Sequence, residues 1–239
     1  MLTIQEIQDL AKYLTMERHS KRIGNQTEDK SYYDDTFSLP LLKDDKYIIR
    51  TGAPARLIDG ITEQIVTSNP QVFNEVRKKT KISSEAAANV ASEMNRWVKY
   101  LNKQTPNPYK QTLKNLLVVG DSYIYVVHND SLPENWQQDY PESIPVRFYV
   151  YDPMVVFYDP DMGEEYGVPN RVIVQYERSA ADIKNNYPDW VNPSSVQRVK
   201  FLMYFDKESR YVEAGGVPLL KDGIQENIYK SVPFVHIYS

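Results

Sequence analysis

The sequence predicts an α+β fold in which helices come first and a mostly antiparallel sheet follows. Three observations lead to this prediction. Apolar residues recur at helical spacing through much of the chain up to residue 119. Short runs rich in Tyr, Val and Ile, bounded by turn residues, dominate from Ser122 onward. A single short helical pattern, over residues 179–186, interrupts those runs.

The first 50 residues predict one amphipathic helix and an extended arm. Thr3 and Glu6 form the S/T-x-x-E pattern of a capping box. The helix expected over residues 3–18 has an apolar face formed by Ile4, Ile7, Leu10, Ala11 and Leu14. Residues 19–50 are polar and have few periodic apolar positions, so we expect an extended arm there. Residues 51–239 then form the main domain.

A second helix is expected to begin at Pro54. Its apolar positions share one face and comprise Leu57, Ile58, Ile61 and Ile65. Gly60 lies inside the pattern and costs about 1 kcal/mol of helix stability relative to Ala. Asn69 and Pro70 should end the helix, and residues 71–76 are a candidate strand.

The clearest helical pattern covers residues 83–103. Ser83 or Ser84 is placed to cap its N-terminus. One apolar stripe follows the helix and is formed by Ala87, Val90, Ala91, Met94, Val98 and Leu101.

The next helix should lead directly into the sheet. Pro108 can begin it because the missing N–H falls among the unpaired donors of the first turn. Gly120 should end it, followed by a turn at Asp121 and Ser122. Ser179, with Asp182 three residues later, should cap the later helix. Strands are expected over residues 122–128, 146–151, 154–158, 171–177, 196–205, 210–214 and 232–238.

Composition excludes several classes of protein. The 239 residues include no Cys, which excludes disulfides, Cys-ligated zinc and thiol catalysis. No stretch approaches the roughly 20 apolar residues that cross a bilayer, and the N-terminus lacks the apolar core of a signal peptide. The net charge of −4 argues against a protein that wraps nucleic acid. The 19 Tyr residues suit half-buried sheet faces and subunit interfaces.

Charge is unevenly distributed along the chain. Residues 71–115 contain nine Lys or Arg against three Asp or Glu, whereas residues 129–167 contain nine Asp or Glu against one Arg. Two solvated faces of opposite sign would explain this distribution. Alternatively, the basic face of one subunit meets the acidic face of the next and steers assembly.

Candidate metal and catalytic residues are few. An acidic loop offers alternating candidate ligands for Ca²⁺ at Asp159, Asp161, Gly163 and Glu165. The EF-hand pattern needs Gly at its sixth position and Glu at its twelfth, but here Gly is fifth and the twelfth residue is Asn170. This mismatch favours a solvated turn. Asp161 and Lys184 fit a nuclease-like P-D…D-x-K pattern, yet Lys184 falls in an expected helix rather than on a strand.

Histidines and alternating tyrosines are two further kinds of side chain that can serve a function. The three histidines, His19, His128 and His236, are far apart in sequence and lack metal-ligand spacing, so structural roles are expected. The alternating tyrosines of residues 122–128 and 148–151 could stack bases, but a packed sheet face explains them as well and needs no basic groove. No catalytic, cofactor-binding or metal-ligating residue is assigned, and no cofactor is expected.

The order of several segments resembles the wing region of tailed-bacteriophage portal proteins. Residues 119–126 read VGDSYIYV and residues 151–153 read YDP. The matching positions are Val119, Gly120, Asp121, Ser122, Tyr123, Tyr125, Val126, Tyr151, Asp152 and Pro153. Tyr32-Tyr33 and residues 51–73, 167–190 and 231–239 resemble further portal segments in the same order, so the resemblance covers about residues 30–239.

The resemblance implies a structural virion protein rather than an enzyme. Portal proteins form a ring, usually a dodecamer, at one capsid vertex, in contact with the major capsid protein. Double-stranded DNA passes through the ring during packaging and ejection, and terminase and head–tail adaptor proteins dock on it. Such a protein assembles in the host cytoplasm and resides in the virion. Portal wings continue into a stem, clip and crown, so we expect the chain to be truncated before the stem. Another head–tail connector or adaptor, or a metal-dependent nuclease, remains an alternative.

Overall fold

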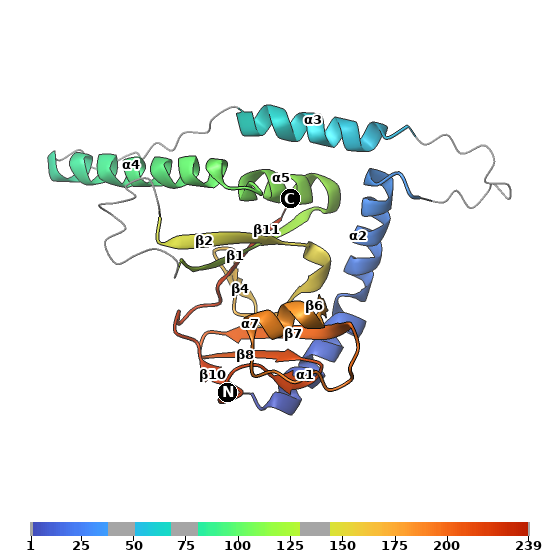
Figure 1. Ribbon diagram of the computed structural model, residues 1–239. Coiled ribbons are helices and arrows are strands. Elements are labelled where there is room, and N and C mark those ends of the chain that lie inside the picture. The colour runs from blue at the N-terminus through green and yellow to red at the C-terminus, as the bar shows by residue number, and fades with distance from the viewer. Residues whose placement is uncertain (1, 38–50, 68–80, 130–143, 239) are drawn as a thin grey trace.

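The computed structural model describes residues 2–37, 51–67, 81–129 and 144–238 and confirms an α+β fold. A layer of helices lies over a three-stranded sheet, a larger sheet lies beneath, and one helix spans the side (Figure 1). The helices are α1 (Ile4–Tyr13), α2 (Ser20–Tyr33), α3 (Ala53–Thr67), α4 (Lys81–Lys103), α5 (Pro108–Val119) and α7 (Ala180–Asn186), with a π-helical turn over Leu14–Arg18.

The described strands pair antiparallel throughout, in two main sheets and one short hairpin. The three-stranded sheet has the order β11 (Phe234–Tyr238), β1 (Asp121–His128) and β2 (Val146–Tyr151). The larger sheet has the order β10 (Gln225–Glu226), β8 (Ser209–Ala214), β7 (Arg198–Asp206), β6 (Arg171–Ser179) and β3 (Val156–Tyr158), with β9 (Val217–Pro218) beside β8. The hairpin consists of β4 (Glu164–Glu165) and β5 (Val168–Pro169).

The N-terminal helix is anchored as its sequence predicts. The Thr3 hydroxyl accepts a hydrogen bond from the Glu6 N–H at 3.3 Å, and the Thr3 N–H donates to the Glu6 carboxylate at 2.7 Å. The apolar face of the helix packs on the larger sheet, where Ile7, Ala11 and Leu14 are buried against Phe157, Ile173, Leu202, Tyr204 and Tyr211.

The expected extended arm over residues 19–50 is wrong for its first part, because Ser20–Tyr33 is helix α2. The segment is polar and lacks an apolar stripe, so its periodicity gave no helix signal. Polar contacts hold it instead: Gln26 is buried, and Lys30 forms an ion pair with Asp152 at 3.2 Å. Residues 38–50 lie outside the described residues.

The helices of the upper layer are confirmed, with small shifts in their ends. Helix α3 begins one residue before Pro54, and α4 begins two residues before Ser83. The expected break at Asn69-Pro70 and the candidate strand over residues 71–76 lie outside the described residues. In α5, Pro108 is the first residue and the Asn107 side chain caps it by accepting from the Lys110 N–H at 3.1 Å.

Gly120 ends α5 as expected. Its φ of 77° is left-handed, and its N–H donates to the Leu116 carbonyl at 3.1 Å. Asp121 begins β1 directly, so the expected turn at Asp121 and Ser122 does not form. Ser179 precedes α7, but its side chain makes no capping hydrogen bond, and the Asp182 carboxylate pairs with Arg178 instead.

The remaining strand predictions hold, with differences at their ends. The strand expected over residues 154–158 is shorter, because Pro153–Val155 forms a 3-10 turn that Asp152 caps by accepting from the Met154 N–H at 3.0 Å. Tyr123, Tyr125 and Tyr151 form the predicted packed face, whereas Tyr149 of β2 is 45 % exposed. Tyr125 and Tyr151 pack against Phe234 with ring centroids 4.8 and 5.7 Å away, and Tyr125 also meets Phe205 of the larger sheet. An aromatic layer therefore joins the two sheets.

Candidate functional site

A cluster of polar side chains surrounds His236 on β11. Its Nε2 lies 3.1 Å from the Asp121 carboxylate and its Nδ1 lies 3.0 Å from the Glu164 carboxylate. The ring stacks on Tyr123 with centroids 4.5 Å apart and planes 4° apart. Each ring nitrogen therefore faces a carboxylate oxygen, a group that only accepts hydrogen bonds. His236 thus ties β11 to β1 and to the β4–β5 hairpin.

Helix α2 closes this cluster from the other side. Gln26 donates to the second oxygen of Asp121 at 2.8 Å, and Arg22 lies 3.6 Å from it. Arg22 also donates to the backbone carbonyls of Pro153 at 3.1 Å and Val156 at 2.7 Å. One carboxylate, Asp121, therefore connects α2, the α5–β1 junction and β11.

His19 completes the α2 side of the cluster as a neutral ring. Its Nε2 lies 2.7 Å from the Tyr158 carbonyl and donates to it, while its Nδ1 accepts from the Arg22 guanidinium at 3.1 Å. Burial lowers the pKa of His19, and the neighbouring Arg22 and Arg18 charges act in the same direction, against the hydrogen bond to Tyr158. The ring therefore orients Arg22 without adding charge.

The surroundings of Asp121 favour its ionised form. Burial acts to raise the pKa of this carboxyl, but hydrogen bonds from His236 and Gln26, with the charges of His236 and Arg22, outweigh burial and lower it. Desolvation raises the pKa of Tyr123, so this buried phenol stays protonated at every ordinary pH. The groups of the cluster thus serve as fixed charges and fixed hydrogen bonds.

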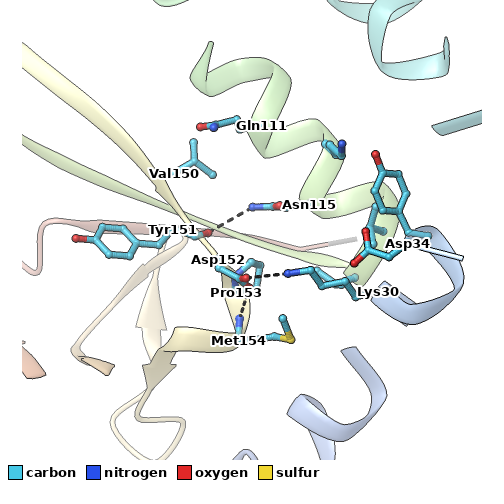
Figure 2. Close-up of a pocket in the computed structure, with 13 residues that line it drawn as sticks. Lys30, Asp34, Gln111, Asn115, Val150, Tyr151, Asp152, Pro153 and Met154 are labelled. Atoms are coloured by element: carbon cyan, nitrogen blue, oxygen red, sulfur yellow. Dashed lines mark hydrogen bonds and ion pairs between the residues drawn. The ribbon is translucent and has the colours of Figure 1, made fainter. Parts of the chain in front are cut away.

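A pocket of about 400 Å³ lies next to the cluster, between α2, α5 and the end of β2 (Figure 2). Its walls include the Tyr151-Asp152-Pro153 turn, and Asn115 reaches toward the Tyr151 carbonyl at 3.4 Å. Lys30 and Lys114 also line it, but Lys30 pairs with Asp152 and Lys114 lies 3.2 Å from Asp59. Each ammonium is thus matched by a carboxylate, so the pocket is polar without a dominant charge.

The acidic loop forms a turn, as expected, but its first carboxylate, Asp159, is buried rather than solvated. Asp159 is 5 % exposed, accepts from the Asp161 N–H at 3.1 Å and pairs with Arg171 at 3.1 Å. Asp161 is exposed and pairs with Arg18 at 3.3 Å. Among the described residues, no group of three or more His, Asp or Glu side chains is arranged to hold a metal ion.

The two residues of the nuclease-like pattern are engaged in separate contacts. Lys184 lies on α7, as the sequence predicts, and its ammonium donates to the Trp190 carbonyl at 2.8 Å. Asp161 lies in the loop before β4, where Arg18 holds it. Their contacts give each a structural role.

The His236 cluster is the feature that sequence reasoning missed. His19 and His236 are 217 positions apart (236 − 19), yet their rings lie 5.2 and 5.1 Å from the same residue, Tyr158. One signal was present: Gly120-Asp121, a match to the portal pattern, places a carboxylate directly after a helix stop. Its partners came from α2 and β11, which no local pattern connects to it.

Comparisons with known proteins leave the family open. Neither the scan against protein-family models nor the search of curated protein sequences finds a match. Within the parts of the chain that the structure describes, no helix combines the length and apolarity needed to span a bilayer.

Proposed function

We propose that this chain is the wing-like portion of a portal ring, a structural virion protein through which double-stranded DNA passes during packaging and ejection. The ring is homo-oligomeric, with terminase, head–tail adaptors and the major capsid protein as its partners. Residues that match the portal pattern make contacts that hold the fold together, and these contacts support the proposal. Gly120 ends a helix, Asp121 joins three elements, and Asp152 caps a turn and binds α2.

The observation that carries the proposal is the uncovered apolar stripe of α4. None of the side chains of residues 84–103 is buried, although the helix has 23 residues. Val90, Met94 and Trp97 are 47 %, 50 % and 38 % exposed, and their spacing places them on one face. An isolated amphipathic helix gains little stability in water unless its apolar face is packed. A neighbouring subunit would supply that packing.

A ring requires two different surfaces on each subunit. Heterologous contacts close into rings when the rotation between neighbours permits it. Catalytic groups are not needed for this function, since a separate motor supplies the energy for DNA movement. A metal-dependent nuclease or another connector remains the competing proposal.

Particle size tests the proposed function. The full-length protein at micromolar concentration should form closed rings by negative-stain microscopy, with a matching mass by mass photometry. Met94→Glu should reduce the yield of rings because it places a charge on the stripe. Ser92→Glu, on an exposed position of the opposite face, is the matched control and should assemble normally. A full-length protein that stays monomeric across concentration and salt contradicts the proposal.

A further inference from the structure

The chain closes most edges of its two main sheets. Helix α2 closes the β3 edge of the larger sheet, where the Val156 carbonyl accepts a hydrogen bond from Arg22 at 2.7 Å. The edge strand on the other side, β10, has only two residues. Beyond β11, the His236 N–H donates to the Gly167 carbonyl of the β4–β5 hairpin at 2.6 Å. Proteins close or shorten their edges in these ways because unpaired N–H and C=O groups attract other strands.

The outer edge of β2 is not closed in this way. The Asn129 N–H donates to the Pro145 carbonyl at 3.0 Å and continues the β1–β2 register. Antiparallel strands bond through alternate residues, so the odd-numbered residues of β2 bond to β1. The N–H and C=O groups of Val146, Phe148 and Val150 therefore point away from β1. Within the described residues, no hydrogen bond is formed to these outward groups.

A groove follows this edge, between β2 and the helices above it. It consists of two pockets of about 310 and 400 Å³, which share Gln111 of α5 and Val150 of β2. Figure 2 shows the Gln111 side chain above Val150 in the larger pocket. Of the described strands, β2 alone contributes to the walls of these pockets, so both lie on its outer side. Phe148 and Val150 are half-buried rather than enclosed. The strand thus borders a hollow along its unpaired edge.

The unpaired groups specify an extended polypeptide as the occupant of the groove. Outward donors and acceptors recur at every second residue of β2, a repeat that another strand matches along its whole length. The groove walls narrow the choice of side chains. The amide groups of Gln104 and Gln111 make no hydrogen bond within the described residues, and they suit uncharged polar side chains. On the other face, Tyr149 is 45 % exposed and suits an apolar or aromatic neighbour across the strands.

We propose that the outer edge of β2 binds an extended, uncharged segment of a partner protein, which adds a fourth strand to the three-stranded sheet. Polar and apolar side chains alternate along this segment, because successive side chains of a strand point to opposite faces. The proposal goes beyond the proposed function and does not depend on ring formation.

A segment of a partner protein fits the edge better than a second copy of this chain does. Within the described residues, the unpaired edge that a second copy offers is its own β2. Such a pairing is isologous and closes as a dimer. It would also bring α4 and α5 of both copies to the same side of the joined sheet, where one set already walls the groove. A single extended segment brings no helices with it.

Selection from a peptide library tests the edge. Random peptides of about nine residues are selected by mRNA display on the full-length protein, and enriched peptides should be poor in Pro and in charged residues. Amide hydrogen exchange at single-residue resolution should show the N–H groups of Phe148 and Val150 slowed about tenfold or more by a bound peptide, with Tyr149 unchanged. A selection without binders, or binders that leave Phe148 and Val150 unchanged, overturns the proposal. Slowed exchange when the protein alone is concentrated would assign the edge to a second copy instead and also overturn it.

The backbone of the peptide provides a second test. Two forms of an enriched peptide carry N-methyl groups at alternate residues, in one frame or in the other. N-methylation removes an N–H, so the form methylated on the edge that faces β2 should lose affinity by about tenfold or more. The other form is the matched control and should bind as the parent peptide does. Equal effects in the two frames contradict strand addition, because a strand bonds to its neighbour through one edge.

Backbone esters in β2 separate binding from folding. Phenyllactic acid in place of Phe148 turns the outward N–H into an ester oxygen, whereas hydroxyphenyllactic acid in place of Tyr149 removes an N–H that bonds to β1. The Phe148 ester should weaken peptide binding by about threefold or more. Its melting temperature should fall less than that of the Tyr149 ester, the matched control, because it removes no N–H of the β1–β2 ladder. Equal falls in melting temperature would show that the Phe148 N–H is already paired in the free protein, which would overturn the proposal.

Discussion

The larger sheet and the helical layer above the three-stranded sheet differ in how far the chain buries their side chains. The central strands of the larger sheet bury their side chains on both faces: Val172, Ile173 and Val174 of β6 are fully buried, and Phe201 and Leu202 of β7 are 1 % exposed. In contrast, α4 buries none of its described side chains, over residues 84–103. The difference indicates that the larger sheet contributes most of the stability of the fold, and in the proposed function the helical layer is the surface that a neighbouring copy covers.

Substitutions in the two regions should therefore differ most in their effect on stability. Phe201→Ala removes a buried ring that contacts Tyr176 and should lower the free energy of unfolding by about 3–5 kcal/mol. Met94→Ala on α4 should change it by no more than about 0.5 kcal/mol. Urea denaturation monitored by circular dichroism measures both. Equal losses in the two variants would show that the helical layer belongs to the folding core.

Substitution at Gly120, where α5 of the helical layer leads into β1, should have the next largest effect on stability. Gly120→Val forces a β-branched residue into the left-handed conformation and should cost about 1–2 kcal/mol. Ring yield should fall with it, because Gly120 sets the angle between α5 and β1. Gly216 also has a positive φ, with open space around its Cβ position, so Gly216→Ala is a control for the conformational effect alone. A Gly120→Val protein with the parent melting temperature would show that this glycine is not needed as a helix stop.

Acid should weaken the same junction through Asp121. Its pKa is lowered in the folded state, so its contribution to stability is present above its unfolded pKa of about 3.8 and is lost as pH falls through the folded value. Asp121→Asn should cost about 1–3 kcal/mol at neutral pH because His236 loses a charged partner. The free energy of unfolding of this variant should also fall less steeply than that of the parent protein as the pH drops below about 4. Thermal melts from pH 2 to pH 7 test this, and an unchanged acid slope would exclude Asp121 as its source.

The same contrast between local and long-range contacts explains which elements could be predicted from the sequence. Periodicity predicted α3, α4 and α5, and the turn residues predicted most strands, because both signals are local. Helix α2 could not be predicted this way, since polar contacts from Arg22 and Gln26 to distant residues hold it. The His236 cluster was missed for the same reason: its members come from four elements that only the tertiary fold brings together.

The smallest effects are expected at the candidate catalytic residues. Asp161→Ala removes an exposed ion pair with Arg18, and such pairs contribute about 0–1 kcal/mol. We expect no hydrolysis of DNA, RNA, ATP or GTP by the purified protein with Mg²⁺, Mn²⁺ or Ca²⁺. Asp161→Ala and Lys184→Ala proteins, purified identically, control for contaminating nuclease. Cleavage that disappears in both variants would favour the nuclease alternative over a structural role.

Hydroxyl-radical footprinting of full-length protein before and after assembly tests the central claim most directly. Met94 and Trp97 on α4 should become protected from oxidation in the assembled particles, because a second copy covers the stripe. Met16, which is 66 % exposed on the π-helical turn, provides an internal reference for oxidation outside the helical layer. Equal oxidation of Met94 and Trp97 in the separate subunit and in the particle would contradict the account.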